Sequence, residues 1–216
     1  MLADLKIHAG ATAAAFRKHR HILVILSATT QVTGAGEPQA VLRALLKRRN
    51  LKQQELAKKP LCANLADGTL VAWTMPDAKH GRFEALAAMR AALGLLLAEN
   101  PLEVAIVAMP GAAHAAGDAV YCASVNGVAM PERKSKGGCN ALRSIHLYGG
   151  REAGAYAELR AQAEGNVLCR ELTALPPNEL SPGAYRRRLR SLAAENRWKR
   201  SEDDTSELQS RETISY

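Results

Sequence analysis

The strongest constraint on the fold is an alternation of short apolar runs with helical patterns along the first 150 residues. The runs are rich in Ile, Val and Leu, too short for helices and bounded by turn residues, which is typical of buried strands. They predict strands at 5–7, 21–26, 69–74, 103–109 and 144–148. Because helical patterns separate the strands, the order predicts an α/β layered domain with a mainly parallel sheet.

The segments between the strands carry their own helix signals. Pro38 suits the first turn of a helix, and Pro101 cannot continue the long helix that precedes it. We therefore expect helices that follow Pro38, that end near residue 99 and that cover residues 112–125. The length of 216 residues is enough for one good core, or for one domain plus a fragment of a second.

After residue 150 the pattern changes from strands to helices. We predict an N-terminal α/β domain at 1–150, a linker helix at 151–176, the start of a truncated second domain at 177–199 and a disordered tail at 200–216. The tail has few apolar residues and no period, so it cannot bury enough surface to offset its ordering entropy. Residues 177–216 are expected to exchange amide hydrogens faster than residues 20–150.

The amino-acid composition limits the classes of protein to which this chain can belong. Hydrophobic residues make up 47% of the chain and charged residues 23%, the profile of a soluble globular protein. Aromatic residues are 4%, which leaves few platforms for stacking bases or sugars. No apolar run near the start could span a bilayer, and basic residues follow the first Ala-rich stretch instead of preceding it, unlike a signal peptide. We expect a cytoplasmic protein with no membrane partner.

The cysteines support that expectation. None forms a C-x-x-C pair, and a secreted disulfide framework is denser in a shorter chain. We expect reduced, mostly buried thiols at Cys62, Cys122, Cys139 and Cys169.

The formal net charge of +8 is concentrated in two segments. Residues 41–59 hold seven Lys and Arg against one Glu, and residues 183–200 also hold seven against one. Two such segments can bind phosphates, although solvated helix faces are the commoner explanation. Nucleic acid is thus a possible partner that salt-dependent binding would test.

No residue is assigned a catalytic, metal-binding or cofactor-binding role from its pattern. His19 and His21 lie among Arg and Lys, which indicates surface charge more than ligation. Gly34 and Gly36 lack the third glycine of a dinucleotide loop. The other side chains considered show no H-E-x-x-H motif, no nucleophile elbow and no binding platform: His8, His80, His114, His146, Ser124, Ser144, Tyr121 and Trp73.

One stretch carries a family resemblance. Residues 164–182 read EGNVLCRELTALPPNELSP. This resembles the junction of the leucyl aminopeptidase family, in which a helix of the type G-N-x-x-R-x-L precedes L-P-P-N-x-x-[ST]-P. The matching residues are Gly165, Asn166, Arg170, Leu172, Leu175, Pro176, Pro177, Asn178, Ser181 and Pro182. Upstream, Lys134, Lys136 and the strand at 142–149 are similar to the end of that family's N-terminal domain.

The resemblance implies a macro-domain-like N-terminal domain that packs in a homo-oligomer, typically a hexamer, of a peptidase acting on peptides. It also implies two divalent metals, such as zinc or manganese, held by a catalytic domain. Motifs resembling G-K-G-x-x-x-D-S-G-G and N-T-D-A-E-G-R, which carry those metal ligands, do not occur here. We therefore expect a non-catalytic N-terminal portion that is inactive alone, with no cofactor of its own; a frameshift or truncation is our hypothesis for its tail.

Two other functions stay open beside that interpretation. A macro-domain-like fold can hold ADP-ribose-type ligands, since Gly-rich loops and helix N-termini suit phosphates. Calorimetry with ADP-ribose tests this binding module. The third hypothesis is nucleic-acid binding through residues 41–59 and 183–200.

Overall fold

The protein is described by a computed structural model covering residues 2–8, 15–27, 36–76, 81–131 and 140–198. The chain divides into two compact units, Met1–Glu171 and Leu172–Tyr216. The expected tail at 200–216, the loop with Lys134 and Lys136, and His80 and Cys139 lie outside the described residues.

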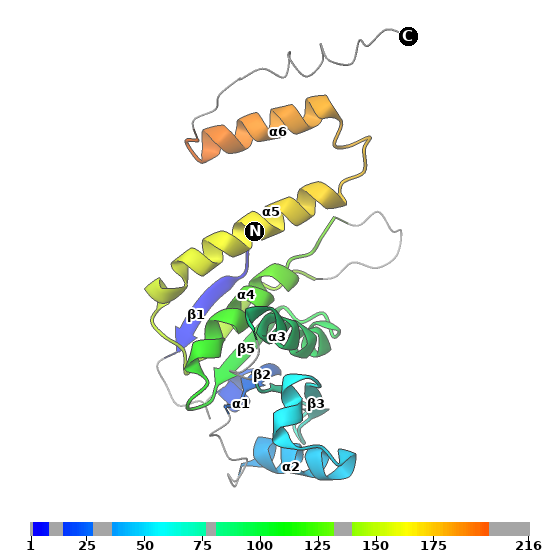
Figure 1. The fold of residues 1–216 in the computed structure, drawn as a ribbon, viewed down its shortest axis with the longest axis vertical. Helices are drawn as coiled ribbons and strands as arrows, with labels where there is room; N and C mark the ends of the chain where they lie inside the picture. The colour runs from blue at the N-terminus through cyan, green and yellow to red at the C-terminus, as the bar shows by residue number, and fades with distance from the viewer. Residues whose placement is uncertain (1, 9–14, 28–35, 77–80, 132–139, 199–216) are drawn as a thin grey trace. The chain divides into compact units, whose positions relative to one another are not determined.

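The first unit is built on a six-stranded sheet (Figure 1). Its strands are β1 (Asp4–His8), β2 (His21–Ile25), β3 (Leu61–Asn64), β4 (Leu70–Thr74), β5 (Glu103–Ala108) and β6 (Ser144–Tyr148). They lie in the order β1-β6-β5-β2-β4-β3, and all neighbours are parallel except the pair of β3 and β4. This confirms the predicted α/β class with a mainly parallel sheet.

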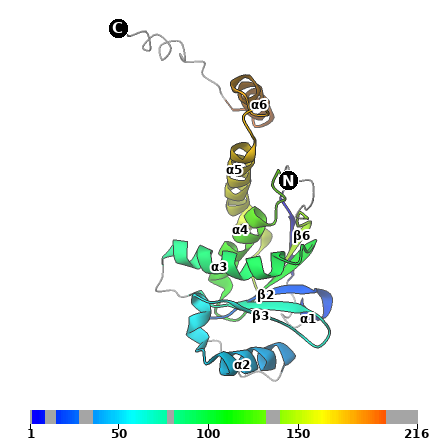
Figure 2. The ribbon, with the colours of Figure 1, turned by 90° about the vertical axis from the view of Figure 1, so that its right-hand side faces the viewer.

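Alternating side chains give the sheet two different faces. Leu23, Ile106 and Ile145 pack in one core with α3 (Arg82–Leu97) and α4 (Ala116–Asn126). Val24 and Trp73 pack in a second core with α2 (Glu37–Arg49) and the 3-10 helix η2 (Gln53–Ala57). Figure 2 shows α3 and α2 on opposite sides of the sheet. We call these sides the α3/α4 face and the α2 face.

Local signals explain the helix bounds. α2 carries a proline in its first turn, and Asn50 ends it in the left-handed conformation, with its N–H donating to the carbonyls of Leu46 and Lys47. α3 ends at Leu97, shortly before Pro101, as expected. The predicted helix at 112–125 begins as the 3-10 helix η3 (Ala113–Ala115) and continues as α4.

Three short elements were not predicted. They are α1 (Ala15–Lys18), η2 and β3. β3 has four residues, of which only Leu61 is buried, so it lacks a clear apolar alternation. It forms an antiparallel edge because it pairs with β4 across the turn at residues 65–69.

Helices follow the sheet, as the sequence predicts. The 3-10 helix η4 (Ala153–Tyr156) leads into α5 (Ala157–Ala174). In the second unit, α6 (Pro182–Glu195) has Ser181 as its N-cap, whose hydroxyl accepts from the amide of Ala184 at 3.4 Å. Between the two helices, the amides of Glu179 and Leu180 donate to the carbonyl of Pro176.

The described cysteines differ in exposure. Cys122 is buried in α4, as expected. Cys62 is half-buried and Cys169 is exposed, so the prediction of mostly buried thiols was wrong for these two. Cys169 lies on α5, and only a narrow side of α5, around Ala163 and Val167, is buried. Among the helices of the described ranges, none has the length and apolar character that a bilayer crossing needs.

The first prediction concerns Gly149, which ends β6 with φ +74. A Cβ there would collide with the carbonyl oxygen of Ala108. Gly149→Ala should lower the free energy of unfolding by at least about 1–2 kcal/mol, the cost of a left-handed Ala alone. Urea unfolding measures this.

Gly94, inside α3, is the matched control, because a Cβ there meets nothing within 4 Å. Gly94→Ala should leave stability unchanged or raise it by up to about 1 kcal/mol through helix propensity. Equal stabilities for the Gly149 variant and the unmodified protein would contradict this description of the turn.

Candidate functional site

The candidate site lies on the α2 face of the sheet, over β1, β6 and β5. Leu5 and Ile7 of β1, like Ile145 and Leu147 of β6, pack with the α3/α4 core. The alternate positions of these strands therefore face the other way. They place one set of polar side chains together: His8, Glu103, Ser144, His146 and Tyr148.

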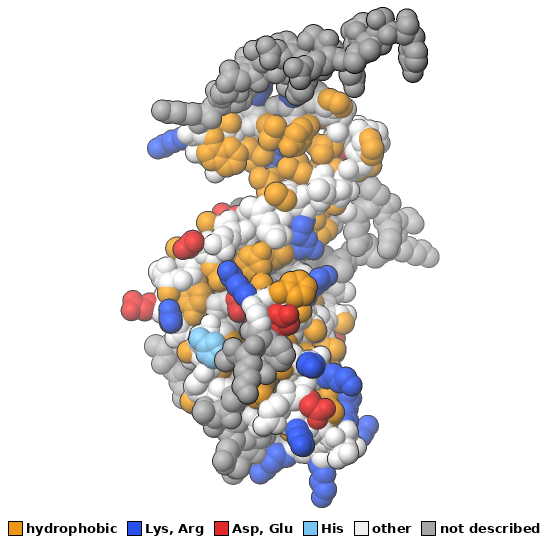
Figure 3. Space-filling view, in the orientation of Figure 1, with side chains coloured by type: hydrophobic (Ala, Val, Ile, Leu, Met, Phe, Trp, Pro, Cys, Tyr) orange, Lys and Arg blue, Asp and Glu red, His pale blue; other side chains and the backbone are white. Residues whose placement is uncertain are grey.

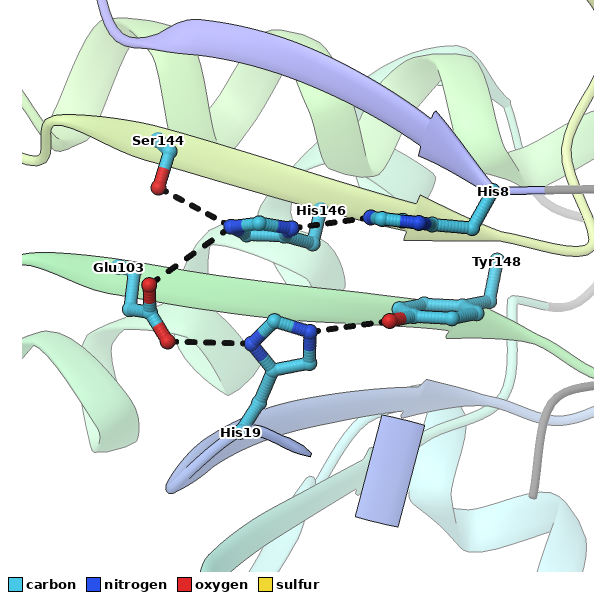
Figure 4. A network of polar contacts seen from close by, with 6 residues as sticks. All are labelled: His8, His19, Glu103, Ser144, His146 and Tyr148. Atoms are coloured by element: carbon cyan, nitrogen blue, oxygen red, sulfur yellow. Dashed lines mark hydrogen bonds and ion pairs between the residues drawn. The ribbon is translucent and has the colours of Figure 1, made fainter. Parts of the chain in front are cut away.

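The three histidines His8, His19 and His146 form what we call the histidine cluster. Each offers a ring nitrogen, and these nitrogens lie within 4.8 Å of one another. His8 Nε2 lies 2.9 Å from His146 Nδ1. His19 enters from the segment between α1 and β2, and its Nε2 lies 3.0 Å from the hydroxyl of Tyr148 (Figure 4).

Glu103 and Ser144 make further polar contacts with the rings of His19 and His146. Glu103 Oε1 lies 3.1 Å from His19 Nδ1. Ser144 Oγ lies 3.1 Å from His146 Nε2, and Glu103 Oε2 lies 3.7 Å from the same nitrogen. The second nitrogen of His146 points to His8, whereas the second nitrogen of His19 points to the Tyr148 hydroxyl (Figure 4).

Ring packing completes the arrangement. The ring of His8 stacks on Tyr148, with centroids 4.4 Å apart and planes at 11°. It also lies parallel to His146, with centroids 5.2 Å apart. The rings of His19 and His146 are tilted, at 4.3 Å. These contacts leave the rings little freedom to rotate.

Burial shifts the pKa values of His8, His146 and Tyr148. Burial and the neighbouring imidazole of His19 lower the pKa of His146 to about 4, although Glu103 acts in the opposite direction. Burial is also the largest cause that lowers the pKa of His8, and the neighbouring His19 is the second. Burial and the carboxylate of Glu103 raise the pKa of Tyr148. At neutral pH His8 and His146 are thus neutral, so each has one N–H and one nitrogen with a lone pair.

His19 corrects a prediction made from the sequence. Its basic neighbours indicated a surface position, but its side chain is buried. The one-turn helix α1 places it there, since the amide of His19 donates to the carbonyl of Ala15. Its partners Glu103 and Tyr148 are 84 and 129 residues away along the chain, so local composition did not reveal them.

The other residues considered do not join the cluster. His21 is partly buried and pairs with Glu99 at 2.8 Å. His114 is exposed on η3, and Ser124 is buried in α4. Trp73 is a core residue, as expected. Gly36 precedes α2, while Gly34 lies outside the described residues.

A cavity of about 690 Å³ lies between α3, α4 and α5 within the first unit. Tyr121, expected in the core, is half-buried and lines this cavity. Two of its polar side chains are already engaged: Asn166 donates to the Tyr121 hydroxyl at 3.1 Å, and Arg170 donates to the carbonyl of Val125 at 2.6 Å. Burial raises the pKa of Cys122, which also lines it, to about 12, so this thiol is not a nucleophile.

The fold is similar to that of two solved enzymes. The bottromycin maturation enzyme BotP, solved in complex with Mn, aligns with a TM-score of 0.59 and 20% identity over 82% of this chain. A mutant of tomato leucine aminopeptidase aligns with a TM-score of 0.58 and 14% identity over 89% of this chain. The chain spans 36% and 42% of these proteins, respectively.

At these identities the comparison shows a distant similarity of fold alone. No protein-family model matches the chain, and no curated protein matches it either.

The second prediction is a loss of stability at mildly acidic pH. An unfolded histidine takes up a proton near pH 6.5, whereas folded His146 stays neutral down to about pH 4. The unfolded state therefore binds more protons in this window, and stability falls as the pH drops from 6.5 toward 4. The groups that face His146 are His8, His19, Glu103 and Lys6.

Urea midpoints at pH 7.5 and pH 5 measure this loss. His146→Gln should reduce the difference between the two midpoints, whereas His114→Gln, on the exposed side of η3, should leave it unchanged. If the His146 variant loses as much stability between pH 7.5 and pH 5 as the unmodified chain, the burial of His146 is not the cause of the loss.

Proposed function

We propose that this chain is the N-terminal, non-catalytic portion of a leucyl-aminopeptidase-type metallopeptidase. The observation that carries the proposal is the segment Leu175–Pro182, which resembles that family's domain junction and follows a domain of peptidase-like fold. On this proposal, release of N-terminal amino acids by a two-metal site belongs to a catalytic domain whose motifs this sequence lacks.

The contacts of the preceding helix support the assignment. Asn166 and Arg170, two residues of the resembling pattern, bond to Tyr121 and to the Val125 carbonyl of α4. At the other end of α5, Arg160 donates to the carbonyl of Ala3 at 3.0 Å. Ala163 and Val167 are buried with Val125. These contacts hold α5 on the sheet domain, next in sequence to the resembling junction.

The third prediction is that the purified chain does not hydrolyse a leucine amide substrate. Added Mn²⁺ or Zn²⁺ should not produce turnover, because the Lys and acidic ligands of the family's two-metal site are missing from this sequence. Release of the product, followed by absorbance, measures this. Robust turnover that a chelator removes would contradict the proposal.

Self-association is part of the same proposal. Tyr185 and Leu189 lie one turn apart on α6 and are 41% and 38% exposed. Figure 3 shows hydrophobic side chains gathered along α6. Exposed apolar side chains in a stripe favour association with another surface. We propose that in the family's homo-oligomer, or in the adjoining domain, this stripe is covered.

The fourth prediction tests this stripe. The double substitution Tyr185→Glu, Leu189→Glu should shift the chain toward monomer in sedimentation velocity, since charges replace the apolar contact. Ala194→Glu, an exposed position on the opposite side of α6, is the control and should keep the distribution of the unmodified chain. Identical distributions for all three proteins would count against the role of the stripe.

The basic surface favours nucleic acid as a second candidate. Along α2 and the segment that follows, Lys47, Arg48, Arg49, Lys52, Lys58 and Lys59 are all exposed. Blue side chains gather around α2 in Figure 3. Phosphate contacts would make binding to duplex DNA fall steeply with added salt. Undetectable or salt-independent binding would exclude this candidate.

A further inference from the structure

We propose that His8, His19 and His146 form a binding site for one divalent transition metal ion of the zinc class. The site goes beyond the proposed function, because it lies within the sheet domain and is made of histidines, not of the Lys and acidic residues that the resemblance implies. Its three ligands come from β1, from the segment after α1 and from β6.

The distances suit such an ion. Zinc binds imidazole nitrogen at about 2.0–2.1 Å, which puts two ligands of a tetrahedral ion about 3.3 Å apart. His8 Nε2 and His146 Nδ1 are 2.9 Å apart, and the three nitrogens lie within 4.8 Å of one another. Small rotations of the rings therefore reach the coordination geometry without movement of the strands.

The outer contacts match those of histidine ligands in metal sites. A ligating imidazole donates its second N–H to a carboxylate, a carbonyl or a hydroxyl group, which fixes the ring and its tautomer. Glu103 plays this part for His19, and Ser144 with Glu103 plays it for His146. The remaining nitrogen of His146, Nδ1, points to His8, and the remaining nitrogen of His19, Nε2, lies against the Tyr148 hydroxyl (Figure 4).

The donor set selects the class of metal. Imidazole suits zinc, copper, nickel and iron, whereas magnesium and calcium prefer oxygen ligands. Three histidines leave a fourth tetrahedral position open to water or another ligand. The hydroxyl of Tyr148 lies 3.0 Å from His19 Nε2. The half-exposed Glu103 and partly exposed His8 give an ion a route from solvent.

The alternative is a hydrogen-bond network without a metal. In it, one proton lies between His8 Nε2 and His146 Nδ1, since one nitrogen must donate and the other accept. An ion would take the place of that proton, and His8 would carry its proton on Nδ1 instead. The two forms share the same ring positions, so metal uptake distinguishes them.

A bound ion would also have a structural effect. β1 is an edge strand that pairs only with β6. The ion would connect its last residue to β6 and to the segment before β2, three parts of the chain far apart in sequence. We therefore expect zinc to raise the midpoint of thermal unfolding.

The test is metal uptake by the full chain after treatment with a chelator. Equilibrium dialysis against ZnCl₂, followed by elemental analysis, should find one zinc per chain. Substitution by Co²⁺ should give visible d–d absorption of a tetrahedral site without thiolate charge-transfer bands, which excludes the cysteines as ligands. These readouts do not depend on peptidase activity, so failure of the site and failure of the proposed function are distinguishable.

Four variants, first checked for native circular dichroism, locate the site. His8→Gln and His146→Gln should lose the bound zinc and the rise in unfolding midpoint. Glu103→Gln should bind about 10–100-fold more weakly, the usual effect of an outer-shell change. His114→Gln, outside the cluster, should bind like the unmodified chain.

His8 lies at the end of an edge strand and is only partly buried, so His8→Gln decides the question if the His146 variant does not fold. The proposal is overturned if the unmodified chain takes up no zinc, or if His8→Gln retains the same zinc with the same affinity.

Discussion

Polar groups that leave water must find partners inside the protein, and this requirement shapes one half of the sheet. On the α2 face, β6 carries Ser144, His146 and Tyr148 at alternate positions. On its opposite side β6 carries the apolar Ile145 and Leu147. His146 is buried, and burial holds it neutral. Its neighbours His8, Ser144 and Glu103 supply the contacts that a neutral imidazole needs. Residues from three strands and from the segment after α1 are thereby held in one arrangement.

The sheet domain is the basis of both proposals, the non-catalytic portion of a peptidase and the metal site. The segment that follows the sheet domain resembles the domain junction of leucyl aminopeptidases, which supports the proposed role as the part of such an enzyme that does not catalyse. The histidine cluster lies within the sheet domain itself. It needs no second domain to be complete, since all of its residues lie in the first unit.

The sequence predicts the fold better than the site, for physical reasons. Apolar runs such as those of β2 and β5 are local signals, and so are Pro38 and Pro101 at helix ends. β3 was missed because a four-residue edge strand buries too little to leave an apolar pattern. His8, His19 and His146 carry no motif, because the sheet order, not the spacing along the chain, brings β1 beside β6 and β6 beside β5. The alternation Ser-Ile-His-Leu-Tyr in β6 was the available signal: polar residues on one side of a buried parallel strand require partners.

The fold brings three imidazoles, from β1, β6 and the segment between α1 and β2, together as the proposed set of metal ligands. A crystal of the chain grown with ZnCl₂, measured on both sides of the zinc absorption edge, tests it most directly. We expect one anomalous difference peak within coordination distance of His8 Nε2, His19 Nε2 and His146 Nδ1. A map with no peak between these rings, while zinc is bound elsewhere on the chain, would contradict it.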